Sequence, residues 1–156
     1  MNIANLLAPE RTRCGATATS KKRCLELLSE LLTGDDADPS TRAVFESLIS
    51  RERLGSTGLG KGVALPHARA PGIDQATAAL LRLDKPVDFD AIDRQPVDLL
   101  FALLVPEHST DEHLRILARL AEMFSDPDLC ERLRTCGSET ELYETVLAWQ
   151  DSRSGS

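Results

Sequence analysis

The sequence predicts an α+β domain, a three-layer α/β/α sandwich in which helices cover both faces of a central mixed sheet. Predicted helices and strands are interspersed along the chain, which is typical of layered architectures. Residues 97–105 are apolar on both faces, as in a strand at the centre of a covered sheet. A chain of 156 residues can bury roughly 70% of its unfolded surface. We therefore expect one domain over residues 1–150 and a disordered tail over residues 151–156.

The first third of the chain predicts a strand and two helices. Residues 12–19 favour a short strand. Residues 20–32 begin with a serine that can cap a helix, carry a leucine-rich stripe at helical spacing, and are followed by Gly34, a helix-ending residue. A second helix has Pro39 in its first turn and ends near Arg53.

The middle and the end of the chain predict the rest of the sheet and its covering helices. Four glycines between positions 55 and 62 predict a flexible loop. Strands are then expected at residues 63–65, 77–83 and 97–105. Two Ser-x-x-Glu capping boxes start at Ser109 and Ser138. The helices that they open are expected to reach about Phe124 and Gln150, and a short helix is expected between them over residues 127–134.

The charge distribution excludes several classes of partner. The net charge of −7 disfavours general binding to nucleic acids or to anionic membranes, because their phosphates would be repelled. Residues 51–70 nevertheless carry +3, with four cations and one acid. A small basic region in an acidic chain suits a compact anion, although a solvated charge cluster at a helix end gives the same pattern.

Cysteine and histidine spacing excludes the usual metal sites. The four cysteines form no Cys-x-x-Cys pair, and the three histidines show no ligand spacing with a carboxylate. We therefore expect no metal, no cofactor and free, mostly buried thiols. The apolar stretches are far shorter than a membrane span and no signal peptide is recognisable, so no membrane insertion and a cytoplasmic location are expected.

The glycine-rich segment is not a nucleotide-binding P-loop. Residues 55–61 fit the first seven positions of G-x-x-x-x-G-K-[ST], but Gly62 stands where the magnesium-binding hydroxyl belongs. A helix is predicted before the loop and a strand after it, the reverse of the P-loop order. ATP or GTP binding is therefore not expected.

His67 is the candidate phosphoryl acceptor. Its imidazole is largely neutral at cytosolic pH and has a lone pair to offer. Pro66 is expected to end the preceding strand and to leave His67 at a strand-to-loop junction, exposed to a partner. On this residue alone, a surface loop histidine explains the pattern better than a phosphoryl acceptor does.

Further side chains can surround a phosphoryl group at His67. His113 lies on the inward stripe of a predicted helix, in the first turn, where the helix dipole disfavours a positive imidazole. A core histidine bonded to a carbonyl is the alternative. Arg51 can hold phosphate oxygens with two N–H groups, or simply favour a helix C-terminus. Ser56 and Thr57 can donate hydroxyls or only form the turn.

The remaining cations and histidine of this region have no assigned role. Lys61 and Arg69 are flexible side chains without a fixed partner in the pattern, and His108 lies in a polar loop.

Several separated motifs resemble one bacterial family. Residues 51–60 and 63–67 strongly resemble the enzyme IIA domains of the fructose/mannitol class in the phosphotransferase system. Residues 89–93 and 95–106 resemble the nitrogen-related enzyme IIA more closely. The resemblance spans about residues 3–146, with the motifs in the family's order.

This resemblance implies both a chemistry and a set of partners. The family's phosphorylated histidine matches His67, its second active-site histidine matches His113, and its active-site arginine matches Arg51. A histidine-containing phosphocarrier protein delivers a phosphoryl group that originates from phosphoenolpyruvate. Nitrogen-related members act as regulators, notably of potassium transporters and sensor kinases, without metal in the transfer step. One departure is Ala68, where many relatives have a glycine that adopts positive φ more freely.

Two alternative functions stay open at this stage. The first is a sugar-specific enzyme IIA, for fructose or mannitol, that passes phosphate to an enzyme IIB. The second is an interaction module that binds partners without carrying phosphate.

Overall fold

A six-stranded mixed sheet with helices on both faces forms the described part of the chain, residues 3–34, 40–108 and 111–154 of a computed structural model. The strands lie in the order β1-β5-β6-β3-β2, and β4 pairs with β6 beyond the end of β3. The elements are β1 (Thr12–Ala16), β2 (Gly58–Gly60), β3 (Val63–Ala64), β4 (His67–Ala70), β5 (Thr77–Val87), β6 (Val97–Pro106), the 3-10 helices η1 (Ile3–Asn5) and η2 (Pro9–Arg11), and α1 (Lys21–Thr33), α2 (Thr41–Leu54), α3 (Asp111–Phe124), α4 (Pro127–Thr135) and α5 (Glu139–Ser154).

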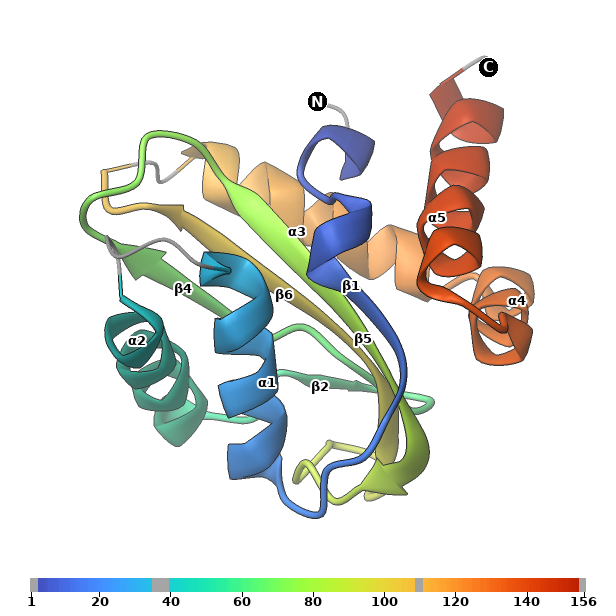
Figure 1. The fold of residues 1–156 in the computed structure, drawn as a ribbon, viewed down its shortest axis with the longest axis horizontal. Coiled ribbons are helices and arrows are strands. Elements are labelled where there is room, and N and C mark those ends of the chain that lie inside the picture. Colours follow the sequence, from blue (N-terminus) through green and yellow to red (C-terminus); the bar gives the residue numbers. More distant parts are fainter. Residues whose placement is uncertain (1–2, 35–39, 109–110, 155–156) are drawn as a thin grey trace.

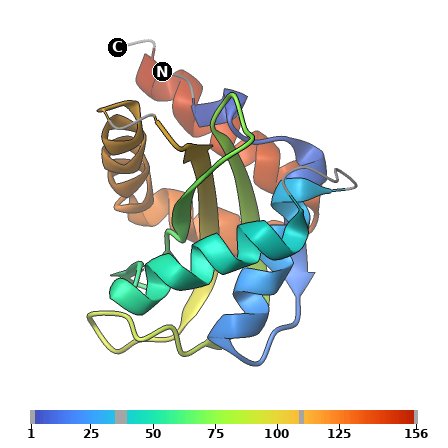
Figure 2. The same cartoon turned by 90° about the vertical axis from the view of Figure 1, so that its left-hand side faces the viewer.

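The helices form two layers around the sheet, so the predicted α/β/α sandwich is confirmed (Figures 1 and 2). Helices α1 and α2 cover one face, where their leucines pack on alternate residues of β5 and β6. Helices α3, α4 and α5 cover the other face, where they pack on the intervening residues of the same strands. Each face of the sheet therefore has its own apolar core.

Strand β6 is the centre of the sheet, as its sequence predicts. It pairs antiparallel with β5, with Leu80 opposite Phe101, and parallel with both β3 and β4. Its leucines alternate between the two cores, so Leu99 and Leu103 lie in one and Leu100 and Leu104 in the other.

The strand containing Pro66 is interrupted but does not end there, which corrects the prediction. The Leu103 N–H donates to the Pro66 carbonyl at 2.9 Å, so pairing with β6 resumes and His67 opens β4. β3 and β4 pair with β6 in the same register, in which the residue at position 66 would donate its N–H to the Phe101 carbonyl. Proline has no N–H, so this hydrogen bond is absent at Pro66. One rung of the ladder is missing, and the strand continues after it.

The predicted flexible loop contains a further strand, β2, which the sequence did not indicate. Its glycine backbone pairs antiparallel with β3, and the Leu65 N–H donates to the Thr57 carbonyl at 3.0 Å. Lys61 and Gly62 turn the chain between the two strands with φ of 57° and 82°. Main-chain pairing, which does not depend on side chains, explains why glycines are tolerated here.

Most of the predicted helix ends and N-terminal caps are found in the structure. The Ser20 side chain accepts from Arg23 N at the start of α1, and the Ser138 side chain accepts from Glu141 N at the start of α5. Helix α5 reaches Ser154, so residues 151–154 are helical rather than part of a disordered tail. The predicted roles of Pro39 and Ser109 at helix starts, and residues 155–156 of the predicted tail, lie outside the described residues.

All four thiols are free, and Cys24, Cys130 and Cys136 are buried, as predicted. Cys14 is half-buried. Within residues 3–34, 40–108 and 111–154, none of the helices has the length and apolar character needed to cross a bilayer.

Replacing Phe101 by alanine should lower the free energy of unfolding by about 4 kcal/mol, because it empties a fully buried site beside Phe124. The matched control is Ile92→Ala. Ile92 is 87% exposed, so that change should stay within about 0.5 kcal/mol. Urea unfolding followed by circular dichroism measures both, and equal effects would contradict the assignment of Phe101 to the core.

Candidate functional site

His67 lies at the start of β4, on the face of the sheet that α3 covers. Leu65 packs into the core on that face, while Ala68 and Ala70 pack into the opposite core beneath α1 and α2. Because side chains alternate along a strand, His67 and Arg69 share the face of Leu65. His67 is half-buried, so its ring is held by the fold and still reachable.

A hydrogen bond to the backbone fixes the tautomer of His67. Its Nδ1 lies 2.8 Å from the Leu65 carbonyl oxygen. A carbonyl oxygen can only accept, so Nδ1 carries the proton and Nε2 keeps the lone pair. Burial lowers the pKa of His67; the bond to Leu65 raises it in part, and the nearby Arg51 charge lowers it again. The ring is therefore neutral near pH 7 and nucleophilic at Nε2.

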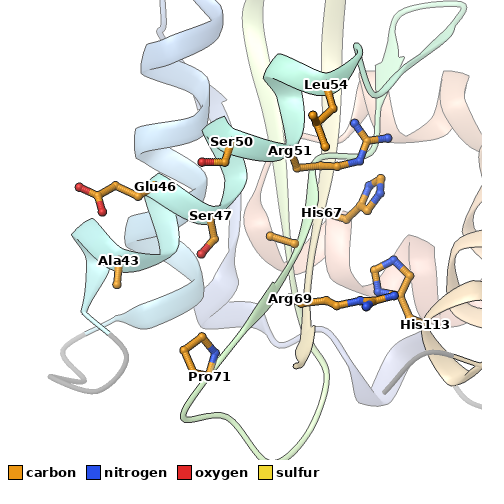
Figure 3. Close-up of a pocket in the computed structure, with 11 residues that line it drawn as sticks. Ala43, Glu46, Ser47, Ser50, Arg51, Leu54, His67, Arg69, Pro71 and His113 are labelled. Carbon is orange, nitrogen blue, oxygen red and sulfur yellow. The ribbon is translucent and has the colours of Figure 1, made fainter. Parts of the chain in front are cut away.

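His113 faces His67 from the first turn of α3. The ring centroids are 5.5 Å apart with an angle of 65° between the planes, and Figure 3 shows the two rings beside each other. Burial lowers the pKa of His113, followed by the charges of His67, Arg69 and Arg51. Its Nδ1 is buried without a hydrogen-bond partner. A buried, unpaired ring nitrogen next to a nucleophile is typical of a site that binds something polar.

Arg51 reaches the same point from the last turn of α2. Its Nη1 donates to the Gly55 carbonyl at 2.8 Å, which anchors the guanidinium over the glycine-rich segment. A guanidinium has five N–H donors, so further donors remain for an anion. In Figure 3 the ring of His67 lies between Arg51 and His113. The structure thus brings together all three residues predicted to carry the chemistry.

Two cavities meet at His67 and Arg51. One, of about 760 Å³, lies between α2, β4 and the start of α3, and includes His113. The other, of about 340 Å³, lies between the glycine-rich segment and α3, and includes Ser56, Thr57 and Leu117. His67 and Arg51 line both, so the candidate acceptor can be approached from either side.

The hydroxyls of Ser56 and Thr57 line the smaller cavity but are already engaged. Ser56 Oγ donates to the Phe89 carbonyl at 2.7 Å and accepts from Gly58 N at 3.0 Å. Thr57 Oγ1 donates to a carboxylate oxygen of Glu52. Neither hydroxyl proton is free in this arrangement, so their contribution to phosphate binding stays a prediction.

Glu52 is a site residue that the sequence analysis missed. Its carboxylate is buried and accepts from Thr57 N at 3.2 Å, from the Thr57 hydroxyl and from Lys21 Nζ at 2.9 Å. The Lys21 ammonium also lies 4.9 Å from the centre of the Phe89 ring. These contacts fix the glycine-rich segment against α1 and α2. The sequence feature that could have identified Glu52 was its position as a lone acid between Arg51 and Arg53.

Lys61 and Arg69, the two cations without an assigned role, lie in different places in the structure. Lys61 lies in the turn after β2, where its N–H donates to Asp93 Oδ2 at 2.8 Å, and it lines neither cavity at His67. Arg69 is exposed, lines the larger cavity and points toward His113 (Figure 3). His108 is exposed and lines neither of these two cavities.

Residues 5–149 match the protein family described as the phosphoenolpyruvate-dependent sugar phosphotransferase system, EIIA 2. The chain belongs to this enzyme IIA family. The three clustered side chains, His67, His113 and Arg51, are those that the motif resemblance assigns to the active site.

Close relatives of this enzyme IIA are nitrogen regulatory proteins, which confirms the resemblance drawn from the motifs. The one from Pseudomonas aeruginosa is 42% identical over 153 residues, covering 98% of this chain and 99% of the relative. The one from Klebsiella oxytoca is 44% identical over 147 residues, covering 94% and 90%. The crystal structure of nitrogen regulatory protein IIA-Ntr from Neisseria meningitidis is 44% identical, with a TM-score of 0.86 over 92% of this chain and 98% of that one.

Ala68 does not disturb the site of this enzyme IIA. Among the described residues, positive φ at non-glycine positions occurs at Lys61, Asp90 and Arg94, and not at Ala68. Ala68 pairs with Leu104 within β4, where extended backbone suits alanine. In the same part of the chain, no three histidine, cysteine or acidic side chains gather as metal ligands.

Glu52→Ala should lower the free energy of unfolding by about 3 kcal/mol, because the substitution leaves Lys21 and the Thr57 N–H without their buried partner. Glu46→Ala is the control, because Glu46 pairs with Arg42 at the solvent-exposed surface. Loss of this ion pair should cost less than about 1 kcal/mol. Urea unfolding compares them. Equal costs would show that the Glu52 contacts add nothing to the fold.

The stability of the chain should fall as the pH drops below about 6.5, because the unfolded state then binds more protons than the folded state. Both histidines have pKa values lowered by burial. Their contribution is fully present above the unfolded-state pKa and is lost progressively toward the folded-state values. Urea unfolding at pH 7.5 and pH 5.5 measures this difference. A His67→Gln, His113→Gln double variant should show a smaller difference, and an unchanged one would contradict the assignment.

Proposed function

We propose that His67 accepts a phosphoryl group from a histidine-containing phosphocarrier protein and that the phosphorylation state of His67 selects regulatory partners. One observation supports this most directly. His67 is held neutral with Nδ1 bonded to the Leu65 carbonyl, so Nε2 is left as a nucleophile at the junction of two cavities.

The transfer needs no proton to move on His67. The Nε2 lone pair attacks phosphorus in line, the new N–P bond forms, and the bond from phosphorus to the donor histidine breaks with its electron pair returning to the donor ring. Nδ1–H stays bonded to Leu65 and stabilises the positive charge that develops on the phosphorylated ring. Catalysis is then mainly positioning and electrostatics.

Each neighbour has a role in this proposal. Arg51 donates to phosphoryl oxygens with the N–H groups that Gly55 does not use. A ring N–H of the neutral His113 donates to another oxygen. Ser56 and Thr57 shape the phosphate-binding wall of the smaller cavity, where they are held by Phe89 and Glu52.

The proposal includes a regulatory role in the cytoplasm. The relatives bear the name nitrogen regulatory protein, and the family resemblance points to potassium transporters and sensor kinases as targets. Phosphorylation adds roughly two negative charges beside Arg51 and the histidines. Such a change alters which partner surfaces are attracted to this region.

Labelling from phosphoenolpyruvate tests the acceptor. The chain is incubated with labelled phosphoenolpyruvate, enzyme I and the phosphocarrier protein, and incorporated label should be lost on acid treatment. His67→Ala should take up no label, while His108→Ala, which changes an exposed histidine outside both cavities, should label as the unmodified chain does. Label on the His67 variant would overturn the assignment.

Arg51→Gln should slow phosphoryl transfer by about 100-fold, the usual cost of removing one donor to a developing oxyanion. Arg53→Gln is the matched control, because Arg53 is an exposed arginine on the same helix that lines neither cavity. Rapid-quench measurements of transfer from the phosphorylated phosphocarrier give the rates. Equal rates for both variants would exclude Arg51 from the transfer step.

Two measurements separate this proposal from its alternatives. A sugar-specific enzyme IIA would pass its phosphoryl group on to a fructose- or mannitol-specific enzyme IIB, and the proposal expects no such transfer. An interaction module would show no acid-labile mass increase when purified from its own host, where the proposal expects a fraction heavier by one phosphoryl group.

A further inference from the structure

The larger cavity at His67 lies along an open edge of the sheet. It touches His67, Ala68 and Arg69 in succession. Alternate residues of a strand point to opposite faces, so a cavity that touches all three lies at the edge of β4 rather than over one face. Strand β2 pairs with β3 only, and among the described residues no strand pairs with β4 on the side away from β6.

The open edge presents unused backbone hydrogen-bonding groups. In the parallel register of β4 and β6, Pro66 and Ala68 are the residues that bond to β6, as the Leu103-to-Pro66 bond shows. The N–H and C=O groups of His67 and Arg69 therefore point away from β6. No hydrogen bond to these groups occurs within the described part of the chain.

Helix α2 forms the opposite wall of a groove that follows this edge. The wall residues Ala43, Ser47, Ser50 and Leu54 recur at spacings of four, three and four, which places them on one face of the helix. Three of the four have small side chains, so the groove stays open along α2 (Figure 3). This wall is about 16 Å long, comparable to the roughly 13 Å of a four-residue strand.

The charges of the groove favour an acidic occupant. Arg51 and Arg69 line it together with the two histidines, and Arg69 has no ion-pair partner in the described part of the chain. Among the described residues that line the groove, Glu46 is the one acid, and it pairs with Arg42 at 3.2 Å. An extended segment with carboxylate side chains would complement both arginines.

We propose that the groove between α2 and β4 binds an extended acidic segment of a partner protein, which adds to the sheet as a strand beside His67 and Arg69. Main-chain hydrogen bonds along the edge supply affinity, and Arg51 and Arg69 supply the preference for acidic side chains. This consequence rests on the proposed function: a phosphoryl group on His67 places negative charge in the same cavity. The phosphoryl group and the acidic segment therefore exclude each other.

A seven-residue peptide of alternating glutamate and valine, blocked at both ends, is the probe. It is titrated into the unphosphorylated chain and followed by NMR, with amide hydrogen exchange measured at saturation. The His67 and Arg69 amides should shift saturably and exchange at least ten times more slowly. A lysine-valine peptide of the same length should not bind. No phosphoryl donor is present, so the outcome does not depend on whether His67 accepts phosphate.

Matched variants locate the peptide. Ser50→Trp fills the groove and should weaken binding at least tenfold, while Arg53→Trp, on the same helix but outside the groove, should bind as the unmodified chain does. Arg69→Pro removes one outward N–H and should abolish binding, whereas Arg69→Gln keeps that N–H and should only weaken binding.

Three results would overturn the proposal. The first is equal binding of the lysine-valine peptide. The second is a set of shifts confined to the smaller cavity, with unchanged exchange at His67 and Arg69. The third is protection of these two amides by self-association without any peptide, which would assign the groove to a second copy of this chain.

Discussion

Strand β6 pairs with two successive segments of one interrupted strand, β3 before Pro66 and β4 after it. Because β6 is buried on both faces, its register fixes the position of every residue opposite it. Proline leaves one rung of this ladder empty, and at the same point β2 stops covering the outer side of the strand. His67 follows directly, so its pairing register with the apolar strand β6 places its backbone, and its own hydrogen bond to the Leu65 carbonyl orients its ring.

The site combines rigid support with unsatisfied polar groups. Glu52 and Lys21 hold the glycine-rich segment through buried contacts, and Arg51 is anchored by Gly55. In contrast, the Nδ1 atom of His113 has no partner although it is buried. An unpaired buried group of this kind costs about 1–3 kcal/mol. The fold places this cost next to the ring of His67.

The sequence predicted the layers, the central strand and the three clustered residues, because apolar periodicity and separated motifs carry that information. It did not predict β4, since a proline after a short apolar run resembles a strand end unless the pairing partner is known. It did not predict β2 either, because backbone pairing leaves no trace in the side chains of glycines. Ser56 and Thr57 were expected either to donate hydroxyls to phosphate or only to form the turn. The present direction of the Ser56 hydroxyl is set by Phe89, which is 33 residues away and which the sequence pattern could not place nearby. The Thr57 hydroxyl is directed by the neighbouring Glu52, whose role the pattern did not indicate.

The single tryptophan of the chain has a useful position. Trp149 is buried on α5, and its Nε1 donates to Asp126 Oδ2 at 3.1 Å. The guanidinium carbon of Arg119 lies over the indole, 5.0 Å from the ring centroid. Arg119 belongs to α3, the helix that carries His113 in its first turn. The indole is thus an intrinsic fluorophore in contact with that helix, so a change in how α3 packs on α5 would alter its emission without any added dye.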